Sequence, residues 1–217
     1  MVIFLAVVFI LASAAIYVRY FKPKFYFLAK PLPIICIILS MLFYYPQIKA
    51  EHRILFWFFE FGFILSLAGD IFLLDKRNFL YGLMSFLTAH IFYLAGFYFN
   101  VEHTYPSFFF NSIIILISFL YAYFLIKNIL KKNQSKYIVP VVIYILLITV
   151  MCLLAYQFYL ANKNTGIYFV TGALLFYLSD FTLSYNKFVK EFYFAQFIIL
   201  LTYYTAQTLF TLGIIRL

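Results

Sequence analysis

Residues 138–160 read IVPVVIYILLITVMCLLAYQFYL, and no charged side chain interrupts this stretch. A helix needs about 20 consecutive apolar residues to cross the hydrocarbon core of a bilayer. Backbone N–H and C=O groups find no water there, and a helix satisfies them within the segment itself. The stretch therefore predicts a membrane-spanning helix.

Seven comparable apolar runs occur elsewhere in the chain. Together the eight runs cover residues 2–18, 27–45, 54–74, 80–99, 107–126, 138–160, 166–185 and 192–213. The 217 residues are 67% hydrophobic and 11% charged, whereas a soluble domain is nearer half apolar and a quarter charged. This composition excludes a soluble globule, a disordered chain and a small disulfide scaffold. We predict an all-α bundle of eight transmembrane helices that forms a single domain over residues 1–217.

The basic residues are distributed unequally between the two ends of the predicted bundle. Eleven of the sixteen lie in loops after the first, third, fifth and seventh spans, namely Arg19, Lys22, Lys24, Lys76, Arg77, Lys127, Lys131, Lys132, Lys136, Lys187 and Lys190. Four lie at the other end, namely Lys49, Arg53, Lys163 and Arg216. Because cytoplasmic loops carry an excess of Lys and Arg, we predict a multi-pass protein of a bacterial inner membrane with both termini outside. This topology explains the net charge of +9 without a nucleic-acid partner.

An internal repeat relates two of the predicted spans. Residues 62–73 and 172–183 share the pattern Gly-x-x-Leu-x-x-x-(Gly or Ser)-Asp-x-x-Leu at an offset of 110. The two copies lie in the third and seventh spans, four positions apart in the order of spans, so both helices run in the same direction. Asp70 and Asp180 are therefore expected at matching depth, near the cytoplasmic ends. The pattern suggests a parallel repeat of four plus four helices.

Asp70 and Asp180 are the strongest candidates for chemistry. A charged side chain at the bilayer centre costs roughly 2.5–3.5 kcal/mol, and such residues usually face the bundle interior and have a function. Two carboxylates at one depth in a low-dielectric site cannot easily both be ionised. One is expected to keep its proton while the other stays charged, which divides the roles of general acid and general base. The alternative is that each aspartate only fixes helix packing.

Lys30 is the one basic residue at the membrane edge. It precedes Pro31 and Pro33, which belong in the first turn of a helix, so regular helix is expected to begin near Lys30. Its ammonium then lies at the positive end of a helix dipole, where a cation is disfavoured. Asp70, Asp180 or a lipid phosphate would supply the missing anion. The alternative is a lysine that snorkels to the interface.

Two further groups of polar side chains lie inside predicted spans. His90 and Tyr93 are one turn apart in the fourth span, and Tyr203, Tyr204 and Gln207 form a stripe in the eighth. These side chains are predicted to order the substrate or a water molecule in a cavity. Hydrogen bonding between helices is the alternative for each of them. The histidines and carboxylates show no metal-ligand spacing, so neither a metal nor another cofactor is expected.

Five motifs together resemble the YhhN family of lysoplasmalogenases. They are Lys30-Pro31-Leu32, Leu67-Ala68-Gly69-Asp70, Ala89-His90-Ile91-Phe92-Tyr93, Gly172-Ala173-Leu174-Leu175-Phe176-Tyr177-Leu178-Ser179-Asp180 and Tyr203-Tyr204-x-Ala206-Gln207. They occur in the family's order and cover about residues 30 to 210. The resemblance implies eight spans, a lysophospholipid substrate taken from membrane lipids, and catalysis by Asp70 and Asp180. Characterised animal members hydrolyse the vinyl ether bond of lysoplasmalogens to a fatty aldehyde and glycerophosphoethanolamine or glycerophosphocholine.

The implied reaction suits a pair of carboxyl groups. A vinyl ether is hydrolysed by protonation of its β carbon, which gives an oxocarbenium ion, and water then adds to that ion. The reaction needs an acid, a base that activates water, and a field that stabilises positive charge, as glycoside hydrolysis does. Lys30 would bind the phosphate at the head-group level.

Two other functions are compatible with the same residues. A proton-coupled secondary transporter could use the two aspartates as a proton relay. A structural or lipid-scaffolding protein would use them for folding alone. The three hypotheses differ in whether a chemical product is released.

Overall fold

A computed structural model describes residues 2–100 and 107–217. Within these residues, eight helical segments are long and apolar enough to cross a membrane, which confirms the predicted all-α, multi-pass class. The α-helices are α1 (Val2–Phe21), α2 (Tyr26–Ala29), α3 (Leu32–Tyr44), α4 (Arg53–Phe72), α5 (Phe79–Asn100), α6 (Phe108–Lys131), α7 (Ile138–Ala161), α8 (Lys163–Phe188) and α9 (Ala195–Ile215). Short 3₁₀ turns join several of them, at Pro23–Phe25, Tyr45–Gln47, Ala50–His52, Lys76–Asn78 and Ser135–Tyr137.

The second span is broken into two helices at Lys30 and Pro31. The prediction that regular helix begins near Lys30 needs correction, because α2 is already helical and the Lys30 amide donates to the Tyr26 carbonyl at 2.9 Å. Helix α3 then begins at Leu32, with Pro33 in its first turn, where the missing N–H of proline costs no helix hydrogen bond. Lys30 therefore lies at the junction of two helices, and only 6% of its surface is exposed.

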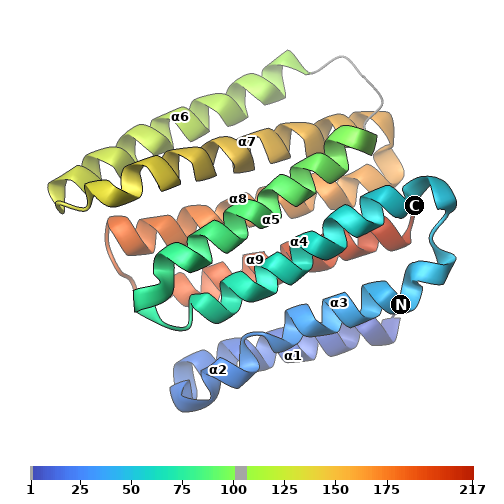
Figure 1. Ribbon diagram of the computed structural model, residues 1–217, viewed down its shortest axis with the longest axis horizontal. Helices are drawn as coiled ribbons and strands as arrows, with labels where there is room; N and C mark the ends of the chain where they lie inside the picture. The colour runs from blue at the N-terminus through green and yellow to red at the C-terminus, as the bar shows by residue number, and fades with distance from the viewer. Residues whose placement is uncertain (1, 101–106) are drawn as a thin grey trace.

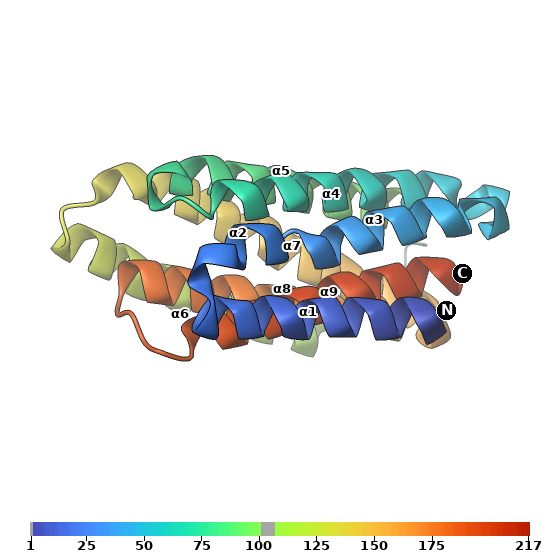
Figure 2. The ribbon, with the colours of Figure 1, turned by 90° about the horizontal axis from the view of Figure 1, so that it is seen from below.

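The helices form two layers (Figure 2). Helices α3, α4 and α5 lie in one layer, and α1, α9 and α8 lie in the other. Helix α9 contacts α8, α1, α3 and α4, so it is the central element of the bundle. On one side α6 and α7 pack against each other, α7 contacts α5 and α8, and α6 contacts α8. The site residues come mainly from the helices that meet at α9.

The connections at the two ends of the bundle differ in charge. Figure 1 shows both termini at one end, and the turns α1–α2, α4–α5, α6–α7 and α8–α9 at the other. The eleven basic residues that the sequence assigns to one side lie in those four turns or in the last two helical turns of α1, α6 and α8 that lead into them. Helices α4 and α8 run in the same direction (Figure 1), as the four-span separation requires. The orientation of this end in the cell and the internal repeat stay predictions.

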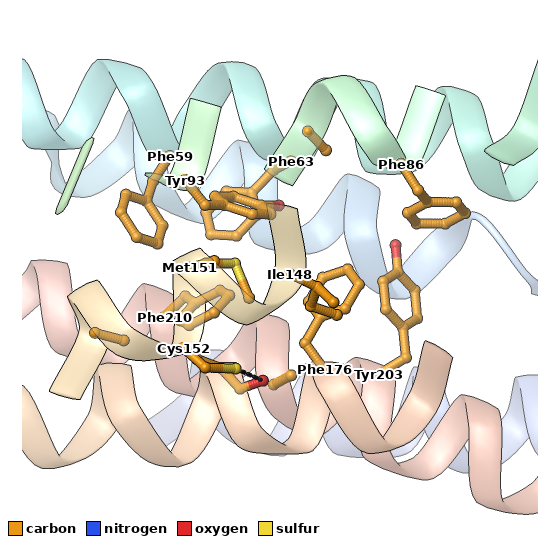
Figure 3. Close-up of a cluster of buried hydrophobic side chains, with 14 of the residues drawn as sticks. Phe59, Phe63, Phe86, Tyr93, Ile148, Met151, Cys152, Phe176, Tyr203 and Phe210 are labelled. Atoms are coloured by element: carbon orange, nitrogen blue, oxygen red, sulfur yellow. Dashed lines mark hydrogen bonds between the residues drawn. The ribbon is translucent and has the colours of Figure 1, made fainter. Parts of the chain in front are cut away.

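The core between the layers is built largely from aromatic rings (Figure 3). Phe59, Tyr93 and Phe210 come from α4, α5 and α9, and their ring centroids lie 5.0 to 5.3 Å apart. Such spacing is favourable for tilted and edge-to-face aromatic pairs. A Cβ at Gly62 would overlap the ring of Tyr93, so glycine is what lets α4 and α5 approach this closely.

Candidate active site

Asp70 lies near the end of α4 and forms a buried ion pair with Lys30. The Lys30 Nζ is 3.2 Å from the Asp70 Oδ1, and it also donates to the backbone carbonyl of Asp70 at 3.0 Å. The Tyr203 hydroxyl donates to the other carboxylate oxygen at 3.0 Å. The anion expected beside Lys30 is therefore Asp70. The snorkelling alternative is excluded, because the ammonium is buried and aimed into the bundle.

Two adjacent residues of α9 hold the two halves of this ion pair. Tyr203 bonds the Asp70 carboxylate, while the Tyr204 hydroxyl donates to the Lys30 backbone carbonyl at 2.8 Å. Helix α9 thus fixes both the carboxylate on α4 and the junction that carries the lysine. The polar stripe that the sequence identifies in this span is partly explained by these two contacts.

Asp180 lies within α8 and has a different set of partners. The Tyr144 hydroxyl of α7 donates to the Asp180 Oδ2 at 2.6 Å, and the His90 Nε2 of α5 lies 3.5 Å from the same oxygen. The other ring nitrogen of His90, Nδ1, is 2.6 Å from the Phe86 carbonyl. A carbonyl oxygen can only accept, so this contact assigns a hydrogen to Nδ1. In a neutral ring the lone pair of Nε2 then faces Asp180, and Nε2 has no hydrogen-bond partner within the described residues.

Both carboxyl groups line one cavity of about 250 Å³. They share no direct hydrogen bond within the described residues. The rings of Phe86, Phe176 and Tyr203, gathered together in Figure 3, have centroids 5.4 to 6.3 Å apart. Tyr203 of this group bonds Asp70, and Phe176 packs on His90, the neighbour of Asp180, with ring centroids 4.6 Å apart. Asp70 and Asp180, which the sequence predicts at matching depth, thus line the same cavity, while their catalytic roles stay predictions.

Tyr93 and Gln207 are not brought to the cavity wall. The Tyr93 hydroxyl donates to the Gln207 Oε1 at 3.0 Å and lies 3.1 Å from the Ser66 Oγ. These bonds tie α4, α5 and α9 together, which is the interhelical alternative that the sequence left open. His90 and Tyr204 likewise act through Asp180 and Lys30, and neither belongs to the cavity lining. Of the predicted substrate-binding residues, Lys30 and Tyr203 reach the cavity.

Tyr144 is the site residue that sequence reasoning missed. It lies in the second turn of α7, within the most apolar span, and no motif or repeat surrounds it. The one available signal is that a tyrosine hydroxyl in such a span needs a hydrogen-bond partner. Among many tyrosines in the chain, 21 in all, that signal does not single out Tyr144.

The fold and the site define a polytopic membrane protein with two buried carboxyl groups facing one intramembrane cavity. Residues 25–214 match the model of the YhhN family, and the chain belongs to that family. Lysoplasmalogenase TMEM86B of Rattus norvegicus is 28% identical over 189 residues, which are 87% of this chain and 72% of that protein. Lysoplasmalogenase TMEM86A of Homo sapiens is 30% identical over 195 residues, 87% of this chain and 78% of that protein. No solved structure gives a significant match.

Proposed function

We propose that this protein is an integral-membrane hydrolase that cleaves the vinyl ether bond of a lysoplasmalogen or a related ether lysophospholipid. The products are a fatty aldehyde and a glycerophospho-alcohol. The names of its relatives support the substrate class. The observation that carries the mechanism is that two carboxyls on one cavity have opposite electrostatic surroundings.

Asp70 is the charged member of the pair in this proposal. It faces the Lys30 ammonium and accepts from the Tyr203 hydroxyl, and both partners favour the carboxylate form. A buried carboxylate with these contacts keeps its negative charge. It stabilises the positive charge of an oxocarbenium ion and accepts a proton from an attacking water.

Asp180 is the protonated member. Within the described residues, no lysine or arginine lies within ion-pair distance of its carboxyl. Burial without a cation favours the neutral acid. In this proposal the Asp180 proton points toward the lone pair of His90 Nε2, which lies 3.5 Å away and has no hydrogen-bond partner in the described part of the chain.

The reaction then returns both carboxyls to their starting states. Asp180 gives its proton to the β carbon, which leaves an oxocarbenium ion and an Asp180 carboxylate. Water adds to the carbon that bears the ether oxygen, and Asp70 takes the proton that the water releases. The hemiacetal breaks its bond to the glycerol oxygen, which takes the proton from Asp70, while the hemiacetal hydroxyl gives its proton to Asp180. One water is consumed, and one aldehyde and one alcohol are released.

The test is aldehyde release from a vinyl-ether lysophospholipid by the purified protein. Asp70→Asn and Asp180→Asn are each expected to lower kcat at least about a hundredfold, the usual scale for a positioned acid or base. Asp75→Asn is the matched control, because Asp75 lies in the α4–α5 turn, pairs with Arg77 and does not line the cavity. Full activity in either folded cavity variant would refute the mechanism. Proton-coupled uptake into liposomes without any product would favour the transporter instead.

A further inference from the structure

A second hollow adjoins the cavity at Asp180. The cavity and this narrower groove share Asp180, Phe79 and Leu183 in their walls, so the two lie side by side. The groove runs among α5, α6, α7 and α8 and is lined almost entirely by apolar side chains such as Leu125 and Val141. The Asp180 carboxyl therefore lies at the boundary between the cavity and the apolar groove.

The far part of the cavity carries an excess of positive charge. We call Arg19, Lys76 and Lys187 the mouth cations, and all three line the cavity at the basic end of the bundle. None of them forms an ion pair within the described chain, where the lysine of the site, Lys30, is already paired with Asp70. Glu191 is the remaining carboxylate of this region, so two positive charges are left in excess. Such a mouth suits an anionic group.

Two aromatic side chains hold mouth cations in place. The Arg19 guanidinium lies over the Tyr26 ring at 5.1 Å, and the Lys187 ammonium lies over the Phe79 ring at 4.5 Å. The Tyr26 hydroxyl is buried in the same wall and has no hydrogen-bond partner in the described part of the chain. A buried hydroxyl without a partner is an unused donor next to the cations. Cations and donor together match the oxygens of a phosphate group.

The groove suits a hydrocarbon chain of small cross-section. Its cavity volume is about 40 Å³, where one water molecule needs roughly 10–15 Å³ on the same measure. The groove therefore accommodates the first carbons of one chain. The rest of a long chain must lie against α6 and the surrounding lipid.

We infer that the cavity and the groove bind one single-chain phospholipid in a defined orientation. Its phosphate is bound by the mouth cations and the Tyr26 hydroxyl, its chain enters the groove, and its ether linkage lies beside Asp180. This inference rests on the proposed function and extends it. The sequence assigns phosphate binding to Lys30, but Lys30 is paired with Asp70. The inference assigns phosphate binding instead to the mouth cations and Tyr26, which belong to no sequence motif.

The first test measures binding rather than hydrolysis. A saturated 1-O-alkyl-glycero-3-phosphocholine, which has no vinyl ether to cleave, is compared with the 1-O-alkylglycerol of the same chain length. Wild type is expected to bind the phospholipid at least about tenfold more tightly, because charge-assisted hydrogen bonds are the strong ones. The triple variant Arg19→Gln, Lys76→Gln, Lys187→Gln is expected to lose this preference. Tyr26→Phe, which removes only a hydroxyl, is expected to reduce it.

A matched triple variant controls for net charge. Lys24→Gln, Lys127→Gln and Lys131→Gln remove three exposed lysines at the same end of the bundle, and none of the three lines the cavity. This variant is expected to keep the preference of wild type. Equal binding of both lipids by wild type, or an unchanged preference in the cavity triple variant, would overturn the inference. Glycerol 3-phosphate tests for a soluble ligand, and binding as tight as that of the phospholipid would also overturn it.

Binding of the hydrocarbon chain in the groove is tested with two valine-to-phenylalanine substitutions on the same helix, α7. Val141→Phe fills the groove, whereas Val139→Phe places the same ring on the outward face of α7, where Val139 is 66% exposed. Only Val141→Phe is expected to weaken binding of the alkylglycerol and the phospholipid, at least about tenfold. Equal effects of the two variants would contradict a chain in the groove.

Failure of this inference can be separated from failure of the proposed function. Suppose that the protein releases aldehyde, but the cavity triple variant binds the phospholipid as wild type does. The proposed lipid orientation would then be rejected, and the proposed hydrolase function would stand. A phosphate preference that depends on the mouth cations, without any aldehyde release, would keep the orientation and reject the hydrolase.

Discussion

Lys30 and Asp70 depend on each other because both are almost entirely buried, with 6% and 2% of their surfaces exposed. Lys30→Met is expected to destabilise the folded protein by about 3–5 kcal/mol, because it leaves a carboxylate buried without its cation. Thermal unfolding in detergent measures this. Lys30→Met combined with Asp70→Leu is expected to regain most of the stability and none of the activity. A single variant as stable as wild type would show that the pair contributes little.

Tyr144 is expected to affect catalysis more than folding. Tyr144→Phe removes the 2.6 Å hydrogen bond to Asp180 and leaves the ring in place. Since a hydrogen bond between uncharged groups contributes on the order of 0.5–1.5 kcal/mol, kcat/KM is expected to fall about two- to tenfold. Tyr123→Phe, on the exposed face of α6, is the control and is expected to change nothing. Unchanged kcat/KM in Tyr144→Phe would remove Tyr144 from the site.

Glu60 is a buried acid that the proposed mechanism does not use. It is 2% exposed, and neither carboxyl oxygen has a hydrogen-bond partner in the described part of the chain. An unpaired buried polar group costs about 1–3 kcal/mol, so Glu60→Met is expected to raise the unfolding temperature without loss of activity. Glu51→Met, at an exposed position, is the control and should give no such gain. Loss of activity at unchanged stability would instead give Glu60 a function.

At the scale of elements, the α4–α5 contact depends on a missing side chain. Tyr93 cannot move away from a new Cβ at Gly62 without losing its bonds to Ser66 and Gln207. Gly62→Ala is therefore expected to destabilise the bundle by about 1–3 kcal/mol, the usual cost of overpacking. Gly96→Ala, where the nearest atoms would lie 3.1 Å from the new Cβ, is the milder comparison in a thermal unfolding series. Equal losses in both variants would contradict the close contact with Tyr93.

The membrane-spanning elements were predictable because lipid leaves few choices. A long apolar run must become a helix, and the predicted runs match the observed helices to within a few residues at most ends. The break at Lys30 was predicted only in part. Pro31 and Pro33 signal where a helix begins, but they do not show whether helix precedes them. The short α2 is such a preceding helix, and its last backbone hydrogen bond runs from the Lys30 amide to the Tyr26 carbonyl.

At the scale of the molecule, the directions of the helices and the end of the bundle that holds the two aspartates were predictable from the sequence. The side chains that contact each aspartate were not. Asp70 and Asp180 lie in the third and seventh spans, which run in the same direction, so both are placed at the same end of the bundle, and the structure puts them on one cavity. Which side chains face each carboxyl depends on how α3, α5, α7 and α9 pack around α4 and α8. Hydropathy carries no information on that packing, so the Lys30 pair remained one of several choices and Tyr144 was missed.

The orientation of the whole bundle decides which leaflet supplies the substrate. The mouth cations lie at the basic end, so the charge distribution predicts that the cavity opens toward the cytoplasmic leaflet. Single cysteines at Ser135 and Ala50, exposed at opposite ends, test this without changing any charge, in a background of Cys36→Ala and Cys152→Ala. A membrane-impermeant thiol reagent is expected to label Ala50→Cys in intact cells and Ser135→Cys only in inverted vesicles. The reverse pattern would place the cavity mouth outside, and the substrate would then have to come from the outer leaflet.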